Sequence, residues 1–243
     1  MSGAEWTVCF VDLELEAVTG VRVGAGRATA AEATDAPLLR DPANRPLIPG
    51  SSLKGSLRSA AERLLRPLGP GPACDVVSDR CLNEVRGREP TIDELESLCS
   101  LCRLFGHPYL AGRLIVGDLV GVGERTIIRD GVAIDRRELK QAGSLKYDYE
   151  VAAPETCFSG KIRIDDPKPH EMGLLLTLLD LVDQGLVTLG GGASRGLGRL
   201  RYSRPPLLTE VVASTFARGT GSAELDADAA RQQFSDWLER RRA

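Results

Sequence analysis

The sequence predicts an α+β fold of the ferredoxin-like type. Its elements occur in the order strand, helix, strands, then strands, helix, strand, which is the βαββαβ pattern with large insertions. A chain of 243 residues suits one large domain or two small ones, and it contains no clear linker. We therefore expect a single domain over residues 1–204, followed by a C-terminal helical extension over 205–243.

The strands are expected where apolar and polar residues alternate. They cover Trp6–Leu15, Arg113–Val122, part of Tyr149–Ile164, Leu186–Leu189 and Leu197–Tyr202. A helix begins at Ser51, shows an apolar face with leucines at 53, 57, 64 and 65, and ends at Pro67–Pro70. A second helix spans Glu171–Gln184 and is closed by Gly185, and a third covers Ala223–Arg242.

Two segments interrupt this pattern. Cys74–Leu104 is an irregular, charged insertion with a short helix near Asp93–Leu98, and we place the whole insertion at residues 70–104. Arg125–Tyr147 is polar and rich in turns, which predicts a protruding hairpin, placed with its flanks at 124–150. Gly20–Ala36, rich in Gly, Ala and Thr, is expected to be a long loop.

Composition limits the functional classes. The chain lacks a run of about 18 apolar residues, which argues against a membrane span, and Met1–Thr7 lacks an apolar signal core. We therefore expect a soluble cytoplasmic protein, in which six cysteines favour free thiols or metal over disulfides. Its net charge of −3 does not exclude nucleic acid, because binding depends on local basic clusters. Aromatic residues make up only 5%, so recognition by many stacked bases is not favoured.

The first notable segment, Ile48–Arg58, leads from a loop into a helix. The first amide groups of a helix lack internal partners and favour anions. Ser51 and Ser52 can cap the helix or donate to phosphate oxygens, while Lys54 and Arg58 lie one turn apart and are predicted to reach one polyanion. An ordinary capped surface helix explains the segment equally well, and the GxxxxGK[ST] order of a P-loop is absent.

The second segment, Leu189–Arg199, contains five glycines among eleven residues. Such a density predicts backbone with positive φ, or backbone that approaches a ligand closely. Arg195 adds a cation suited to phosphate. A flexible turn is the alternative, but a simple turn needs only one or two glycines.

Together the two segments resemble a known family. Pro49-Gly50-Ser51-Ser52-Leu53-Lys54-Gly55, followed late in the chain by Gly190-Gly191-Gly192-Ala193-Ser194-Arg195-Gly196-Leu197-Gly198, is similar to motifs of the RAMP superfamily of CRISPR-associated proteins. The resemblance covers nearly the whole chain, from Trp6 to Tyr202, and it is strongest to the repeated backbone subunit of type III effector complexes.

The resemblance implies a modified RNA-recognition fold whose copies, or related RAMP subunits, stack along a CRISPR RNA (crRNA) beside other type III subunits. It implies that Ser51, Ser52, Lys54, Arg58, Gly191, Gly192, Ser194 and Arg195 hold the guide's backbone. The hairpin at 124–150 would be a thumb that separates nucleotides of the duplex between guide and single-stranded target RNA. Base pairing would then supply specificity, as in other RNA-guided effectors.

The resemblance also points to a catalytic residue. Active members of the family cut target RNA with a divalent metal and an aspartate in the loop before the Pro-Gly-Ser-Ser motif, and the matching residue here is Asp35. A carboxylate can hold a hydrated Mg²⁺ that organises the attacking group. A lone loop aspartate is otherwise a turn residue, and Asp41, before Pro42, is interpreted as one.

Four cysteines of the insertion predict a structural zinc site. Cys99 and Cys102 have the close spacing of a zinc knuckle, whereas Cys74 and Cys81 are separated by six residues. The insertion has little apolar content, so a metal would replace its core. Some type III backbone subunits, notably of groups D and E, carry zinc in this region, which points to subtype D. Free thiols, or His107 in place of Cys74 or Cys81, are the alternatives.

Three functions remain open from the sequence. The chain is expected to be an RNA-guided endoribonuclease subunit with Asp35 at its centre. It could instead be a guide-binding scaffold without catalysis, or a RAMP-type enzyme that processes precursor crRNA. The third type often relies on histidine, tyrosine or lysine near the glycine loop, and no histidine lies near Gly190–Gly198 in the sequence.

Overall fold

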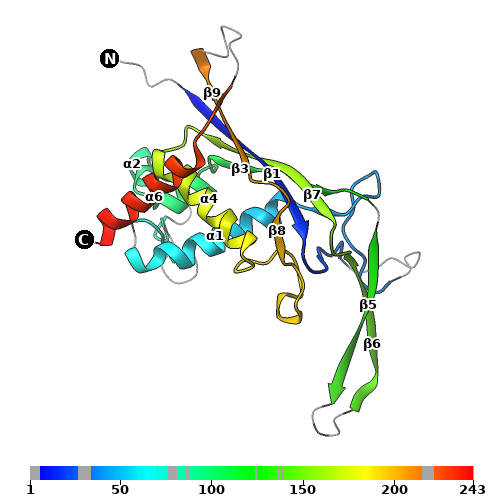
Figure 1. The fold of residues 1–243 in the computed structure, drawn as a ribbon. Coiled ribbons are helices and arrows are strands. Elements are labelled where there is room, and N and C mark those ends of the chain that lie inside the picture. Colours follow the sequence, from blue (N-terminus) through cyan, green and yellow to red (C-terminus); the bar gives the residue numbers. More distant parts are fainter. Residues whose placement is uncertain are drawn as a thin grey trace.

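The computed structural model describes residues 6–26, 34–69, 71–75, 81–85, 88–123, 125–135, 137, 140–214 and 222–242. Positions 1–5 of the predicted domain, positions 70, 76–80 and 86–87 of the insertion, and positions 124, 136 and 138–139 of the hairpin lie outside these ranges. Within them the chain is α+β, as predicted (Figure 1). No helix of the described residues is long and apolar enough to cross a membrane.

The main sheet is built around two long antiparallel strands, β1 (Thr7–Ala17) and β7 (Cys157–Asp165). On one side, β8 (Leu200–Tyr202) and β9 (Leu207–Val212) both pair with β1, and β10 (Ala223–Glu224) extends β9. On the other side, β3 (Leu114–Val116) and β4 (Leu119–Gly121) pair with β7, and β2 (Leu47–Ile48) follows β4. The central order is therefore β8-β1-β7-β3.

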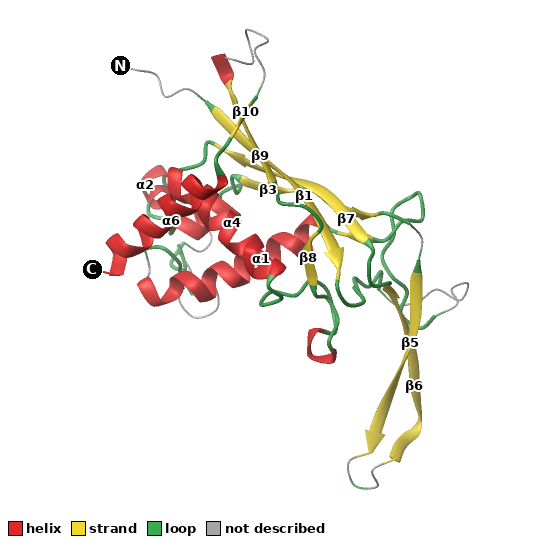
Figure 2. Ribbon diagram, in the orientation of Figure 1, coloured by secondary structure: helices red, strands yellow, loops and turns green. Residues whose placement is uncertain are grey.

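The helices gather on one face of this sheet (Figure 2). They are α1 (Gly50–Leu65), α2 (Ile92–Glu96), α3 (Ser100–Phe105), α4 (Pro169–Asp183) and α6 (Ala227–Arg242), with short 3₁₀ turns at Arg66–Leu68 and Ala193–Arg195. Alternate residues of β1, such as Val11 and Leu13, are buried against leucines of α1 and α4. The predicted apolar faces therefore form the core, which fixes α1 on the sheet.

The hairpin β5 (Thr126–Asp135) and β6 (Lys140–Ala152) forms a separate two-stranded sheet. It projects away from the helices and the main sheet (Figure 1). Its base stays close to the body, because Val21 bridges to Ala152 and Ala36 bridges to Tyr149.

Three expectations differ from the structure. The strand predicted over Arg113–Val122 is split into β3 and β4 at Asp118, whose carboxylate accepts the Gly50 N–H of α1. Leu186–Leu189 is not a strand, because the Leu186 and Val187 N–H groups turn back to the Leu181 carbonyl. The segment after 204 is not purely helical, since β9 belongs to the main sheet, and the terminal helix begins at Ala227 because Ala223–Glu224 pair with β9.

Candidate nucleic-acid interface and metal centre

The start of α1 packs tightly against the turn between β3 and β4. A Cβ added to Gly50 would lie 2.0 Å from the Val116 carbonyl oxygen, so only glycine fits this position. The Gly50 N–H donates to Asp118 Oδ1 at 2.8 Å, and neither Ser51 nor Ser52 caps the helix. A carboxylate therefore already occupies part of the helix start that was predicted to bind phosphate.

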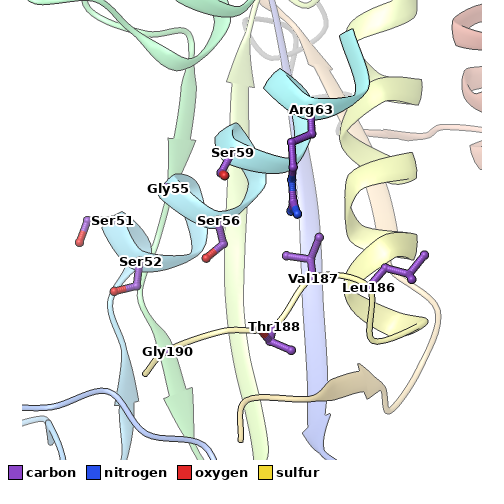
Figure 3. A pocket seen from close by; sticks show the side chains of 10 residues that line it. All are labelled: Ser51, Ser52, Gly55, Ser56, Ser59, Arg63, Leu186, Val187, Thr188 and Gly190. Atoms are coloured by element: carbon purple, nitrogen blue, oxygen red, sulfur yellow. The ribbon is translucent and has the colours of Figure 1, made fainter. Parts of the chain in front are cut away.

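A groove of about 510 Å³ lies beside α1, between the helix and the segment leading into the glycine loop. Figure 3 shows Ser52, Ser56 and Arg63 of α1 pointing toward Val187, Thr188 and Gly190. The full lining is Ser51, Ser52, Gly55, Ser56, Ser59, Arg63, Leu186, Val187, Thr188 and Gly190. The structure thus places one side of α1 and the entry to the glycine loop against the same space.

The polar groups of this groove are available to a ligand. Among the described residues, the hydroxyls of Ser51, Ser52, Ser56, Ser59 and Thr188 and the Arg63 guanidinium have no hydrogen-bond partner. Ser52, Ser56, Ser59 and Arg63 follow one another at helical spacing on one side of α1. The helical spacing of these four residues can be recognised in the sequence, but Ser56, Ser59 and Arg63 were not predicted as binding residues.

Lys54 and Arg58 lie away from this groove. Arg63, which lines the groove, follows Lys54 by about two and a half helical turns. The side chains of Lys54 and Arg63 therefore project from opposite sides of α1. Lys54 Nζ donates to the Leu114 carbonyl at 2.7 Å, and burial together with Arg58 lowers the pKa of Lys54. The pair that was predicted to reach one polyanion is thus directed toward the protein.

Arg58 holds three protein groups. Its Nε donates to Glu62 at 2.9 Å, Nη1 to the Gly106 carbonyl at 2.8 Å, and Nη2 to Cys102 Sγ at 3.6 Å. These contacts join α1 to the end of α3 and to the cysteine cluster.

The glycine loop turns repeatedly through the left-handed region, as predicted. Gly190, Gly192, Gly196 and Gly198 all have φ values between 78° and 86°. At Gly190, an added Cβ would also lie 2.2 Å from the Arg22 carbonyl oxygen, which accepts the Gly191 N–H at 2.7 Å. The close approach at Gly190 is therefore to the chain's own backbone, while Gly191, Ser194 and Arg195 remain exposed.

Two tyrosines of β6 connect the glycine loop to the hairpin. Arg195 Nη1 donates to the Tyr147 hydroxyl at 2.6 Å, and the Arg22 guanidinium lies 5.1 Å from the Tyr149 ring centroid. The two rings are 6.0 Å apart. Tyr147, Tyr149 and Arg22 were not predicted, because contacts between segments so distant in sequence leave no local pattern.

Asp35 also lies at the base of the hairpin. Its N–H donates to Asp148 Oδ1 at 2.7 Å, and its Oδ2 accepts the Asp148 N–H at 3.1 Å. Asp35 is exposed, so its carboxylate is accessible. Asp41 instead accepts the N–H groups of Ala43 and Arg45, which is the predicted turn.

The four insertion cysteines come together. The Sγ atoms of Cys74, Cys81, Cys99 and Cys102 all lie within 4.8 Å of one another. A tetrahedral Zn²⁺ with Zn–S bonds of about 2.3 Å requires sulfur separations of about 3.8 Å, so the donor set fits zinc with little adjustment. Backbone N–H groups of Cys74 and Cys102 point at Cys99 Sγ at 3.4 Å, as suits a thiolate.

The four thiols do not share one protonation tendency. A hydrogen bond from the Cys102 thiol lowers the pKa of Cys99 to about 4, whereas burial raises the pKa of Cys81 to about 12. The pKa of Cys102 is raised because that thiol donates to Cys99 and is buried. These shifts favour the thiolate at Cys99 and the neutral thiol at Cys81 and Cys102, so a divalent metal bound to all four sulfurs would have to displace the protons of those two thiols.

The two histidines lie in separate environments. His107 Nε2 lies 3.0 Å from the Cys81 carbonyl oxygen and Nδ1 accepts the Tyr109 N–H at 3.4 Å, so both ring nitrogens are occupied without metal. His170 stacks on Trp237 of α6, with ring centroids 4.6 Å apart. This arrangement supports the four-cysteine set over the alternative with His107.

Comparison with known proteins identifies the family. The family model described as the RAMP superfamily matches residues 14–201. This chain belongs to the RAMP superfamily. Within the superfamily it is similar to the CRISPR system Cms endoribonuclease Csm3 of Mycobacterium tuberculosis (strain ATCC 25618 / H37Rv), with 29% identity over 217 residues, 78% of this chain and 84% of the relative. The protein of the same name from Streptococcus thermophilus is 29% identical over 210 residues, 76% of this chain and 83% of that protein. The resemblance predicted from the two glycine motifs is thereby confirmed.

Proposed function

We propose that this RAMP protein is the backbone subunit of a type III CRISPR ribonucleoprotein, binding crRNA and cutting complementary target RNA at regular intervals. The similarity to two proteins named Csm3 endoribonuclease, each matched over most of its length, supports this class of activity. The partners would be crRNA, single-stranded target RNA, further copies of this chain or related RAMP subunits, and other type III subunits, all in the cytoplasm.

The observation that carries the proposal is the groove between α1 and the glycine loop. It offers hydroxyl donors and a guanidinium, which suit phosphate and ribose oxygens, and the described residues that line it include no aromatic ring on which a base could stack. A surface of this kind holds the backbone and leaves the guide bases free to pair.

We propose that the RNA backbone is bound by Ser51 and Ser52 of α1 and by Gly191, Gly192, Ser194 and Arg195 of the glycine loop. The hydrogen bond from Arg195 to Tyr147 orients the arginine. Arg63 joins them as the cation that lines the groove. Lys54 and Arg58 are assigned to structural contacts instead, because their head groups bind protein acceptors.

The strand order β8-β1-β7-β3, with helices on one face, supports a modified ferredoxin-like RNA-recognition fold for the core. The projecting hairpin β5–β6 is then the thumb that crosses the guide–target duplex.

We assign a structural Zn²⁺ to Cys74, Cys81, Cys99 and Cys102, because the donor set and its spacing fit a closed tetrahedral site. The ion would hold the insertion against α1 through Arg58.

For cleavage we propose Asp35 as the catalytic carboxylate. A divalent cation such as Mg²⁺ would activate the attacking group and neutralise developing charge. Asp35 is exposed and has one carboxylate oxygen, Oδ1, without a partner among the described residues.

The experiment is to reconstitute the complex with a guide, a complementary RNA and Mg²⁺, and to compare wild type with Asp35→Ala. We expect regularly spaced products from wild type, none from Asp35→Ala, and unchanged products from the nearby Asp41→Asn control. Unchanged cleavage by Asp35→Ala would make the chain a scaffold. Prompt metal-independent cutting of repeat RNA by the isolated chain would instead indicate crRNA processing.

A further inference from the structure

The loop that carries Asp35 is attached to the hairpin along several consecutive residues. Ala36 pairs with Tyr149 as a parallel bridge, and the Glu150 N–H donates to the Ala36 carbonyl at 3.1 Å. The Leu38 N–H donates to Glu150 Oε2 at 3.0 Å. The loop therefore runs alongside β6 over these residues.

The attachment continues into a charged contact at the foot of the hairpin. Arg40 Nη2 lies 2.5 Å from Glu150 Oε1, and Thr126 of β5 donates to the same carboxylate oxygen at 2.7 Å. Both side chains of the ion pair are mostly buried, at 21% and 15% exposed. Both strands of the hairpin thus fix the far end of the Asp35 loop.

At Asp35 itself the contact is reciprocal. The Asp148 carboxylate accepts the Asp35 N–H, and the Asp35 carboxylate accepts the Asp148 N–H. The first bond orients the Asp35 backbone and the second fixes one oxygen of its side chain. A rotation of Asp35 away from this geometry would break one of these bonds or both.

We propose that Asp148 is a positioning residue for the nuclease centre, which is built jointly from the Asp35 loop and the base of the hairpin. This inference rests on the proposed catalytic role of Asp35. As a consequence, the position of the hairpin determines the position of the Asp35 carboxylate. A hairpin that binds the target duplex therefore places Asp35 beside the RNA at the same time.

Two substitutions at Asp148 separate positioning from charge. Asp148→Asn keeps a side-chain oxygen that can accept the Asp35 N–H but removes the negative charge, whereas Asp148→Ala removes the acceptor. A catalytic group displaced by about 1 Å can cost on the order of 100-fold in rate. The Asp148 N–H, which fixes Asp35 Oδ2, remains in both variants, so the displacement should be partial. We therefore expect the cleavage rate to fall about tenfold or more for Asp148→Ala and to stay near the wild-type rate for Asp148→Asn.

The measurements are single-turnover cleavage by the reconstituted complex as a function of Mg²⁺ concentration, together with guide and target RNA affinity. For Asp148→Ala we expect a lower rate and a higher half-saturating Mg²⁺ concentration, with unchanged RNA affinities. Asp228→Ala, which removes an exposed carboxylate from the first turn of α6, should match wild type.

Three results would overturn the inference: wild-type cleavage by Asp148→Ala, equal losses in the alanine and asparagine variants, or a loss of target affinity that accounts for the slower cleavage. Each can occur while Asp35→Ala still abolishes cleavage. The failure of this inference is therefore distinguishable from the failure of the proposed function.

Discussion

Arg58→Ala tests whether this arginine serves the metal site or the RNA. The substitution removes hydrogen bonds to the Gly106 carbonyl and to Cys102 Sγ and an i,i+4 pair with Glu62. A hydrogen bond from a charged donor contributes about 1.5–3 kcal/mol, and an exposed helical pair about 0.3–0.5 kcal/mol. Since the guanidinium is only 25% exposed, we expect a total loss of about 2–3 kcal/mol in the free energy of unfolding.

A loss of that size corresponds to a melting temperature lower by roughly 5–10 °C in a domain of this size. Removing a group that hydrogen-bonds a metal ligand typically weakens metal binding about 10–100-fold. In competition with a chromophoric chelator, the equilibrium constant for zinc transfer from the protein should therefore be at least about tenfold larger for Arg58→Ala than for wild type.

The matched control is Arg63→Ala, which removes an arginine from the opposite side of α1. This variant should retain zinc and lose RNA affinity, whereas Arg58→Ala should do the reverse. Wild-type zinc retention by Arg58→Ala, combined with weakened RNA binding, would refute the assignment of Arg58 to the metal site.

Three further outcomes follow from the structure. Gly190→Ala should lower stability by about 1–3 kcal/mol in denaturant unfolding, because its φ is +86° and its Cβ would strike the Arg22 carbonyl. Burial lowers the pKa of His170 below 6.5, so the unfolded chain binds more protons. Stability should therefore fall as pH drops below about 6.5 and level off beneath the folded pKa, and His170→Phe should flatten this dependence. Removing zinc with a chelator should make the insertion more susceptible to protease and leave the susceptibility of the hairpin unchanged, and Cys99→Ser should do the same.

The parts of the fold that follow local periodicity could be predicted from sequence. Apolar alternation identified β1, and helical spacing identified α1 and α4. β9 could not be identified in this way, because two prolines precede it and most of its residues are only half-buried. Its place in the sheet is set by pairing with β1 far away in the sequence.

The residues of the candidate sites could also be predicted only where the pattern is local in the sequence. The four cysteines were predicted as one cluster because their chemistry and spacing are local, and they do converge. Lys54 and Arg58 were expected to face a polyanion, but their direction depends on which carbonyls lie beside the helix, such as that of Leu114, and no sequence pattern shows this. The contact between Asp35 and Asp148 joins residues 113 positions apart, so no sequence window could show it.

The most direct test of the central claim measures RNA affinity against salt concentration for wild type, Arg63→Ala and Lys54→Ala, using several unrelated guide sequences. If the groove beside α1 holds the backbone, Arg63→Ala should weaken binding equally for all guides and lower the salt slope by about 0.7 for one lost phosphate contact. Lys54→Ala should leave that slope unchanged. An unchanged slope for Arg63→Ala, or a loss confined to particular guide sequences, would contradict a backbone grip in this groove.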